Sequence, residues 1–283
     1  MIKRKFSWAG VDVPVIGQGT WMIEGSGDAR RQAIKALQQG LDLGLTHIDT
    51  AEMYGNGLVE ELVAEAIEGR RDEVFLVSKV LPSNASYEGT IKACKRSLKR
   101  LKTDRLDLYL LHWPSNHPIK ETMRAMEKLV AEGMIKLIGV SNFDLQELEE
   151  AEQALSKQQL ACNQVFYHLG YRGIERHLLP YCTKNGIAVV GYSPFGHGDF
   201  PSPQSAGGRV LAEIAERHNR TPRQVALNFL TLHPNVFTIP KAGHPEHAKE
   251  NSGAVSWSLT GEDIAAIDRA FPVPHVDTPL EMI

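Results

Sequence analysis

Short apolar segments alternate with segments of helical periodicity along most of this chain. Residues 15–19 are typical of a buried strand, and beyond residue 28 the apolar side chains Ile34, Leu37 and Leu41 recur at helical spacing. The eight expected strands span residues 15–19, 45–49, 74–79, 106–112, 135–140, 161–165, 187–191 and 236–239. Nearly continuous apolar strands separated by helices are typical of a parallel sheet covered on its outer face. Eight such units favour a closed (β/α)₈ TIM barrel over an open doubly wound sheet.

The alternation predicts one domain with few additions. No change in composition marks a linker, so we expect residues 1–283 to form a single barrel domain. Before the first strand, residues 6–14 place Ala9-Gly10 between two short mixed runs, which is compatible with a small β-hairpin. Later helices are expected over residues 174–185 and 209–218, and residues 221–224 have the sequence of a capping box with Pro at the first helical position.

Composition narrows the class of protein. The net charge of -3 gives no reason to expect nucleic acid or an anionic membrane as a partner. No apolar run approaches the roughly 20 residues of a membrane span, and the first residues lack the apolar region of a signal peptide. The three cysteines are far apart and odd in number, so they predict neither a disulfide framework nor a zinc knuckle. These features favour a reducing compartment, and we expect the cytoplasm. We expect a monomer, because no amphipathic stretch lies outside the barrel pattern.

Three consecutive expected strands end in an ionisable residue. Asp49, Lys79 and His112 occupy these positions, and Tyr54 follows Asp49 by five residues beside turn-forming glycines. Singly, each has an ordinary explanation, such as a helix cap, a solvated lysine, a structural histidine or a packed aromatic ring. A charge at the end of a buried strand is costly unless it is paired. Since the carboxyl ends of barrel strands share one rim, we expect the four side chains to converge there.

These four residue types can together act as a general acid. A free phenol has a pKa of about 10, and a nearby ammonium lowers that pKa. A carboxylate keeps the ammonium charged, and an imidazole can hold a substrate oxygen in line with the phenol. This assembly suits a carbonyl that becomes an alcohol. None of the four is an evident nucleophile toward carbon, and a hydride-carrying cofactor would supply what attacks it.

Longer motifs surround these positions in a fixed order along the chain. They are Gly17-Gln18-Gly19-Thr20-Trp21, Ile48-Asp49-Thr50-Ala51-Glu52-Met53-Tyr54-Gly55, Val77-Ser78-Lys79-Val80, Asp104-Arg105-Leu106-Asp107-Leu108-Tyr109-Leu110-Leu111-His112-Trp113-Pro114, Ile138-Gly139-Val140-Ser141-Asn142-Phe143, Asn163-Gln164-Val165 and Ile239-Pro240-Lys241. Through these motifs nearly the whole chain resembles the aldo-keto reductase superfamily, in particular its bacterial methylglyoxal and diketo-gluconate reductases. The resemblance implies a (β/α)₈ fold and NADPH-dependent reduction of aldehydes and ketones. It makes Tyr54 the proton donor, Lys79 and Asp49 its tuning partners, and His112 the residue that orients the carbonyl.

The same resemblance implies which residues hold the cofactor. Ser141, Asn142 and Gln164 would contact the nicotinamide carboxamide, and Tyr192 would stack on the nicotinamide ring. Ser193 and the following loop would approach the pyrophosphate. The adenosine end would be held by Lys241, His247, Glu250 and Asn251. A hydroxyl and two amides are suited to a buried carboxamide.

Two positions depart from the family pattern at the adenosine end. Where many members have Ser or Thr and then Arg, this chain has Ala242 and His247. Arg has a permanent charge, whereas His is charged only in part near its ordinary pKa of about 6.5. Because Lys241 is retained, we expect a modest preference for NADPH, with NADH less favoured, and we expect this preference to fall as pH rises.

The substrate pocket is expected to be aromatic and open. Trp21 and Trp113 would line it, together with Tyr54 and Phe143. After the last expected helix, over residues 265–271, only a short tail remains, and the loop at residues 196–208 is also brief. These lengths, compared with the family, favour small, polar carbonyl substrates such as methylglyoxal or sugar-derived ketones.

Two other classes of function compete with a carbonyl reductase. A metal-dependent barrel hydrolase is suggested by eleven histidines, but His47 and Asp49 share a strand face with only one imidazole and one carboxylate, and we expect no metal site. An NADPH-binding regulatory or sensor module with the same fold would not need the complete set of Asp49, Tyr54, Lys79 and His112.

Overall fold

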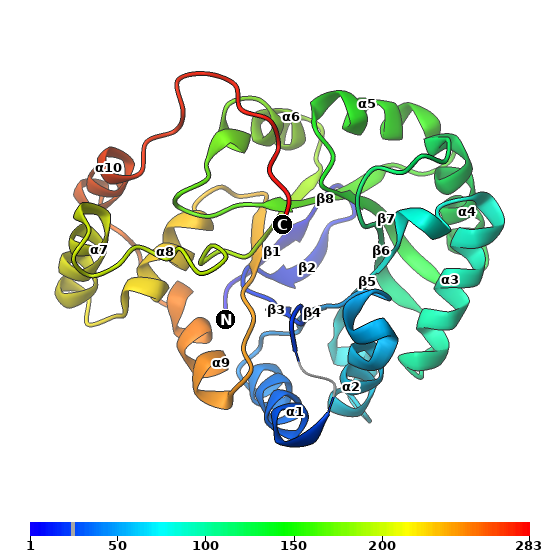
Figure 1. The fold of residues 1–283 in the computed structure, drawn as a ribbon, viewed down its shortest axis with the longest axis horizontal. Coiled ribbons are helices and arrows are strands. Elements are labelled where there is room, and N and C mark those ends of the chain that lie inside the picture. Colours follow the sequence, from blue (N-terminus) through cyan, green and yellow to red (C-terminus); the bar gives the residue numbers. More distant parts are fainter. Residues whose placement is uncertain (24–25) are drawn as a thin grey trace.

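A parallel barrel forms the centre of the molecule. The computed structural model describes residues 1–23 and 26–283. Within this part of the chain, eight parallel strands form one sheet in sequence order, from β3 to β10 (Figure 1). Parallel bridges between Ile16 and Thr238 and between Gly19 and Lys241 join the first strand to the last. The bridges close the sheet, which confirms the predicted (β/α)₈ barrel.

The strands are short and the helices alternate with them. The barrel strands are β3 (Gln18–Gly19), β4 (His47–Asp49), β5 (Phe75–Val80), β6 (Leu106–Leu111), β7 (Ile135–Ser141), β8 (Leu160–Phe166), β9 (Ala188–Tyr192) and β10 (Val236–Ile239). The helices in the described residues are α1 (Gly27–Asp42), α2 (Leu58–Ala66), α3 (Tyr87–Arg100), α4 (Ile119–Ala131), α5 (Leu145–Ala154), α6 (Leu178–Lys184), α7 (Ala206–Arg217), α8 (Pro222–Leu230), α9 (Pro245–Ser252) and α10 (Gly261–Ala270).

Two helical segments differ from the expectation. The helix expected over residues 174–185 is split into a 3₁₀ turn, Gly173–Glu175, and α6. His177 separates them because its backbone, at φ -135°, is not helical. The helix α9 was not predicted, since among its eight residues only Ala248 and Asn251 are buried and the apolar periodicity is therefore weak.

A hairpin closes the amino-terminal end of the barrel. The strands β1 (Lys3–Phe6) and β2 (Val11–Pro14) pair antiparallel, which confirms the hairpin compatible with this part of the sequence. The Phe6 ring lies 5.0 Å from the Phe75 ring and 4.9 Å from the Phe237 ring, near the first residues of β5 and β10. The His47 ring is buried in the same cluster. The opposite end of the barrel is therefore the one that remains accessible.

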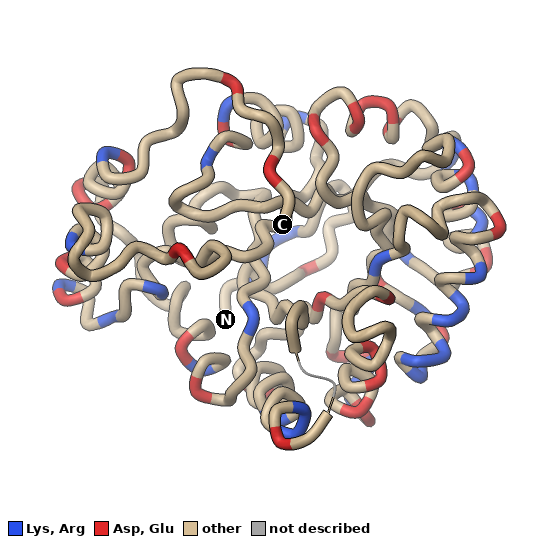
Figure 2. The backbone as a smooth tube through the Cα atoms, viewed as in Figure 1, with Lys and Arg blue, Asp and Glu red and all other residues tan. Residues whose placement is uncertain are grey.

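Local sequence explains where the outer helices begin and which face they bury. The capping box expected at residues 221–224 is present, with Thr221 and Gln224 exchanging hydrogen bonds at the start of α8. On α3, Ala93, Cys94 and Leu98 are buried, while lysines and arginines cover the outer face of the helix (Figure 2). All three cysteines are buried and free. No helix in the described residues has the length and apolar character to cross a membrane.

Candidate active site

The Lys79 ammonium lies at the centre of the cluster expected at the strand ends. Its Nζ lies 2.5 Å from Asp49 Oδ1 and 3.2 Å from Tyr54 Oη, and it donates a further bond of 2.9 Å to the Thr50 carbonyl oxygen. The Lys79 side chain is completely buried, and the Asp49 carboxylate is almost so. The structure thus brings an acid, an amine and a phenol into one continuous set of contacts.

A tight turn after β4 positions the phenol above the amine. Tyr54 begins a 3₁₀ turn in which Gly55, Asn56 and Gly57 all have positive φ, at 54°, 51° and 92°. Two of the three are glycines, which adopt this left-handed conformation without steric cost. The preceding Glu52 carboxylate accepts hydrogen bonds from the Leu81 amide and from Asn84 Nδ2. These bonds fix the turn against the loop that follows β5.

The His112 imidazole is neutral and faces the phenol. Its ring centroid lies 5.8 Å from that of Tyr54, at an interplanar angle of 72°. Burial, together with the charge of Lys79, lowers the pKa of His112 to about 2. A neutral imidazole has one donor and one acceptor nitrogen, so it can hold a polar group without adding charge.

The Tyr54 phenol and the Lys79 amine both keep their protons. Burial raises the pKa of Tyr54, and the nearby Lys79 ammonium lowers it by less. The expected effect of the lysine is therefore present, but it is outweighed by the loss of water around the phenol. For Lys79, burial lowers the pKa, while Asp49 and Tyr54 raise it more, so that the net shift is upward. The cluster accordingly contains a protonated phenol beside a charged ammonium.

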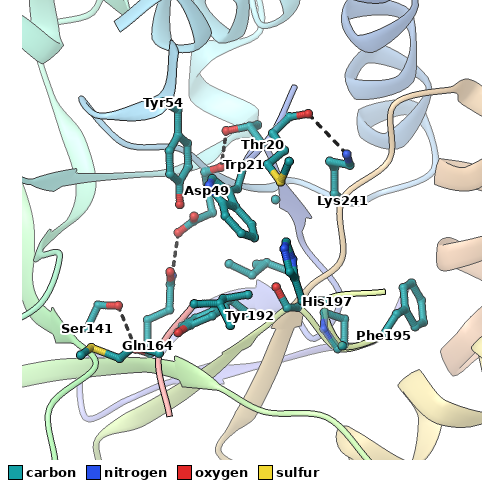
Figure 3. Close-up of a pocket in the computed structure, with 18 of the residues that line it drawn as sticks. Thr20, Trp21, Asp49, Tyr54, Ser141, Gln164, Tyr192, Phe195, His197 and Lys241 are labelled. Atoms are coloured by element: carbon teal, nitrogen blue, oxygen red, sulfur yellow. Dashed lines mark hydrogen bonds between the residues drawn. The ribbon is translucent and has the colours of Figure 1, made fainter. Parts of the chain in front are cut away.

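A cavity of about 570 Å³ lies over these groups at the carboxyl ends of the strands (Figure 3). Every site residue expected from the sequence lines it except Lys79, which is completely buried, and Phe143. The expected lining residues are Trp21, Asp49, Tyr54, His112, Trp113, Ser141, Asn142, Gln164, Tyr192, Ser193, Lys241, His247, Glu250 and Asn251. Phe143, also expected there, is buried in the hydrophobic core instead.

Side chains at the ends of β7, β8 and β9 form a hydrogen-bonded polar wall. Ser141 Oγ donates to the Gln164 carbonyl oxygen at 2.9 Å, and Tyr192 Oη donates to Asn142 Oδ1 at 2.8 Å. Asn142 and Ser193 have φ of 60° and 49°. Positive φ is uncommon for residues other than glycine and is concentrated at functional sites. Asn142 is held in this wall by two contacts, since its Nδ2 donates to the His112 carbonyl oxygen at 3.1 Å and its Oδ1 accepts from Tyr192.

Three basic residues also line the cavity, and we call them the basic group: Arg223, Lys241 and His247. Lys241 is exposed, and its Nζ lies 3.4 Å from the Met22 carbonyl oxygen. Between α8 and α9, Glu250 Oε1 accepts a hydrogen bond of 2.7 Å from Thr221 Oγ1. Sequence reasoning did not find Arg223, because nothing in the first turn of α8 distinguishes a residue that lines a cavity from a solvated one.

The chain beyond α10 returns to the cavity, a path that was not predicted from the sequence (Figure 1). Met282 and Ile283 line the cavity despite the shortness of the tail. The tail is attached by Arg176 Nε, which donates to Asp277 Oδ1 at 2.6 Å, and by Tyr171 Oη, which accepts from the Glu281 amide at 2.7 Å. The length of a tail does not reveal these contacts, so they could not be predicted from the sequence.

The loop between β9 and α7 supplies lining residues that were not predicted individually. They include Phe195 and His197. The His197 ring stacks on Trp21, with centroids 5.3 Å apart and an interplanar angle of 30° (Figure 3). This contact joins loops that follow the first and the seventh strands of the barrel, and it narrows the cavity beside Tyr192.

The fold and the arrangement of this site agree with comparisons to known proteins. Residues 15–271 match the model of the Aldo/keto reductase family. The chain therefore belongs to the aldo/keto reductase family, and this membership makes it an oxidoreductase.

Individual relatives cover almost the whole chain. It is 44% identical to the methylglyoxal reductase YeaE of Escherichia coli (strain K12), over 96% of each chain. It is 37% identical to the glyoxal reductase of Bacillus subtilis (strain 168), over 92% of this chain and 89% of the relative.

Two solved structures of aldo-keto reductases are also similar to this chain in sequence and in fold. An aldo-keto reductase from Klebsiella pneumoniae in complex with NADPH is 42% identical, with a TM-score of 0.93 and full coverage of both chains. A structure of an aldo/keto reductase from Klebsiella pneumoniae in complex with NADP and acetate has a TM-score of 0.91, with 42% identity and 99% coverage of both chains.

Proposed function

We propose that this protein reduces small aldehydes and ketones to alcohols with NADPH as the hydride donor, and that methylglyoxal is a substrate. The observation that carries the proposal is the contact series Asp49–Lys79–Tyr54 beside a neutral His112. The names of two relatives, a methylglyoxal reductase and a glyoxal reductase, support the substrate class. NADH is a less favoured alternative donor.

The cavity has the chemistry that a nicotinamide cofactor needs. Ser141, Asn142 and Gln164 offer a hydroxyl and two amides to the carboxamide, and the Tyr192 ring offers a face for stacking. Gln164 directs Nε2 to Asp49, so its side-chain oxygen is the group available for the carboxamide nitrogen. The complexes of the Klebsiella pneumoniae relatives with NADPH and with NADP support this assignment.

The opposite part of the cavity suits the phosphates and the adenosine. Ser193 and the loop after it would contact the pyrophosphate. Lys241 and His247 would face the 2′-phosphate, while Glu250 and Asn251 would contact the adenosine. A lysine contributes a point charge to a phosphate, and histidine contributes charge only when protonated.

Tyr54 is the proton donor in the proposed reaction. The bound cofactor supplies a hydride to the carbonyl carbon. As negative charge develops on the carbonyl oxygen, Tyr54 Oη donates its proton to that oxygen. The Lys79 ammonium, 3.2 Å from Tyr54 Oη, stabilises the phenolate that remains, and Asp49 keeps Lys79 charged. His112 holds the carbonyl oxygen without competing for the proton.

The walls near Tyr54 suit a small substrate. Trp21 and Trp113 would contact it, and the stack of His197 on Trp21 together with Met282 limits its size. Methylglyoxal and small sugar-derived ketones fit this restriction better than extended aromatic carbonyls.

A substrate assay with both cofactors tests the proposal. The purified protein is incubated with NADPH or NADH and with methylglyoxal or p-nitrobenzaldehyde, and cofactor oxidation is followed at the absorbance of the reduced nicotinamide. We expect turnover with NADPH that is insensitive to EDTA. Cofactor binding without turnover of any carbonyl would instead favour the regulatory module, and turnover abolished by EDTA would favour the metal enzyme.

A further inference from the structure

The basic group contains one cation with a different environment from the others. Arg223 lies in the first turn of α8, and its guanidinium carbon lies 5.2 Å from the centre of the Phe195 ring and 5.5 Å from that of Phe200. Across residues 1–23 and 26–283, no carboxylate pairs with Arg223 and no hydrogen bond uses its guanidinium. Two aromatic rings therefore orient a planar cation whose donors remain available on a cavity wall.

The turn that carries Arg223 is attached to the helix that carries His247. Thr221 Oγ1 donates to Glu250 Oε1 at 2.7 Å, and Gln224 Nε2 donates to the Glu250 carbonyl oxygen at 2.8 Å. These bonds come from the residues two before and one after Arg223. They fix the backbone of this turn relative to Glu250, which lies one helical turn from His247.

Arg223 differs chemically from the other two members of the basic group. Lys241 offers a flexible point charge, and His247 carries a charge only when it is protonated. Arg223 is the only permanently charged, planar donor among the described residues that line the cavity. Guanidinium groups bind phosphate through two parallel hydrogen bonds, which are stronger than those between neutral groups.

We propose that Arg223 is a specificity-determining residue that binds the 2′-phosphate of the cofactor and so favours NADPH over NADH. The inference rests on the proposed function, since it concerns the same cavity and the same cofactor. Arg223 supplies a permanent charge, whereas the charge of a histidine depends on its protonation. The preference for NADPH is consequently less dependent on pH than Lys241 and His247 alone would make it.

Binding measurements on substituted proteins test this role without using activity. Dissociation constants for NADPH and NADH are measured by isothermal titration calorimetry at pH 8 for the wild type, Arg223→Gln and Arg223→Lys. The control is Arg124→Gln, because Arg124 also lies over an aromatic ring, that of Tyr87, but on the outer helix α4. Thermal denaturation verifies that each variant is folded.

We expect Arg223→Gln to raise the Kd of NADPH by roughly tenfold or more, which is the scale for losing a hydrogen bond to a charged group. The Kd of NADH should change by less than about twofold, Arg223→Lys should be intermediate, and Arg124→Gln should match the wild type. Equal weakening of both cofactors would place Arg223 on the diphosphate and overturn the proposal. Unchanged NADPH binding would also overturn it. A wild type that binds neither cofactor would instead refute the proposed function.

Discussion

Gln164 Nε2 donates a hydrogen bond of 2.7 Å to Asp49 Oδ2, although the two residues are 115 positions apart in the sequence. The other oxygen of the same carboxylate, Oδ1, accepts the bond from Lys79. Asp49 thus connects the polar wall of the cavity with the ammonium beneath Tyr54. A buried carboxylate with both oxygens occupied is well compensated, and it becomes costly when either donor is removed.

Replacing the buried lysine should therefore affect stability as well as activity. In Lys79→Met, Gln164 is the one side-chain donor left to the Asp49 carboxylate among residues 1–23 and 26–283, so we expect a loss of about 3–5 kcal/mol in the free energy of unfolding. Urea denaturation measures this loss. The double variant Asp49→Asn with Lys79→Met should recover at least half of it but no activity. If the single variant is as stable as the wild type, the carboxylate has been protonated or hydrated in a way that this structure does not predict.

The rate of reduction should be nearly independent of pH around neutrality. His112, whose pKa is lowered to about 2, stays neutral throughout this range. Tyr54, whose pKa is raised, stays protonated until the pH exceeds the ordinary phenol value of about 10. We expect kcat at saturating NADPH and methylglyoxal to vary by less than about twofold between pH 6 and pH 9. An inflection near pH 6.5 that disappears in His112→Gln would contradict the assignment of a neutral imidazole.

The buried His47 should make the protein less stable in mild acid. Burial lowers the pKa of His47 to about 4, so below its ordinary pKa of about 6.5 the unfolded chain takes up a proton that the folded chain does not. Stability is then lost as pH falls, by roughly 1 kcal/mol per pH unit between about pH 6 and pH 4. Denaturant titrations of the wild type and His47→Leu over this range should differ in slope by that amount. Identical slopes would show that His47 does not titrate in this way.

Freeing the tail should relax substrate selection. Asp277→Ala removes the exposed carboxylate that holds the tail to Arg176. We expect kcat/KM for p-nitrobenzaldehyde to rise about two- to fivefold relative to that for methylglyoxal. Glu262→Ala, on the exposed face of α10, serves as the control. An unchanged ratio in Asp277→Ala would mean that the tail does not limit the size of the substrate.

The positions of residues at strand ends could be predicted because parallel strands place their carboxyl ends on one rim. Asp49, Lys79 and His112 required only the correct alternation of strands and helices, since the barrel brings them together. The motifs around them also indicated the family, which the match over residues 15–271 confirms.

The remaining wall of the cavity depends on how loops return to the barrel. Met282, His197 and Arg223 lie on segments whose path is decided by contacts distant in sequence, such as the bond between Arg176 and Asp277. The local periodicity of apolar residues in the sequence does not predict those contacts. The direction in which the pKa of Tyr54 shifts also required coordinates, because the effect of burial had to be compared with that of Lys79.

The central claim is that Tyr54 donates the proton to the substrate oxygen, and its most direct test is the turnover of methylglyoxal by Tyr54→Phe. The variant keeps the ring that faces His112 and removes only the hydroxyl that contacts Lys79. We predict that kcat falls by at least about a hundredfold, the scale for loss of a positioned general acid, while the Kd of NADPH stays within about twofold of the wild type. A kcat close to that of the wild type would show that another group donates the proton.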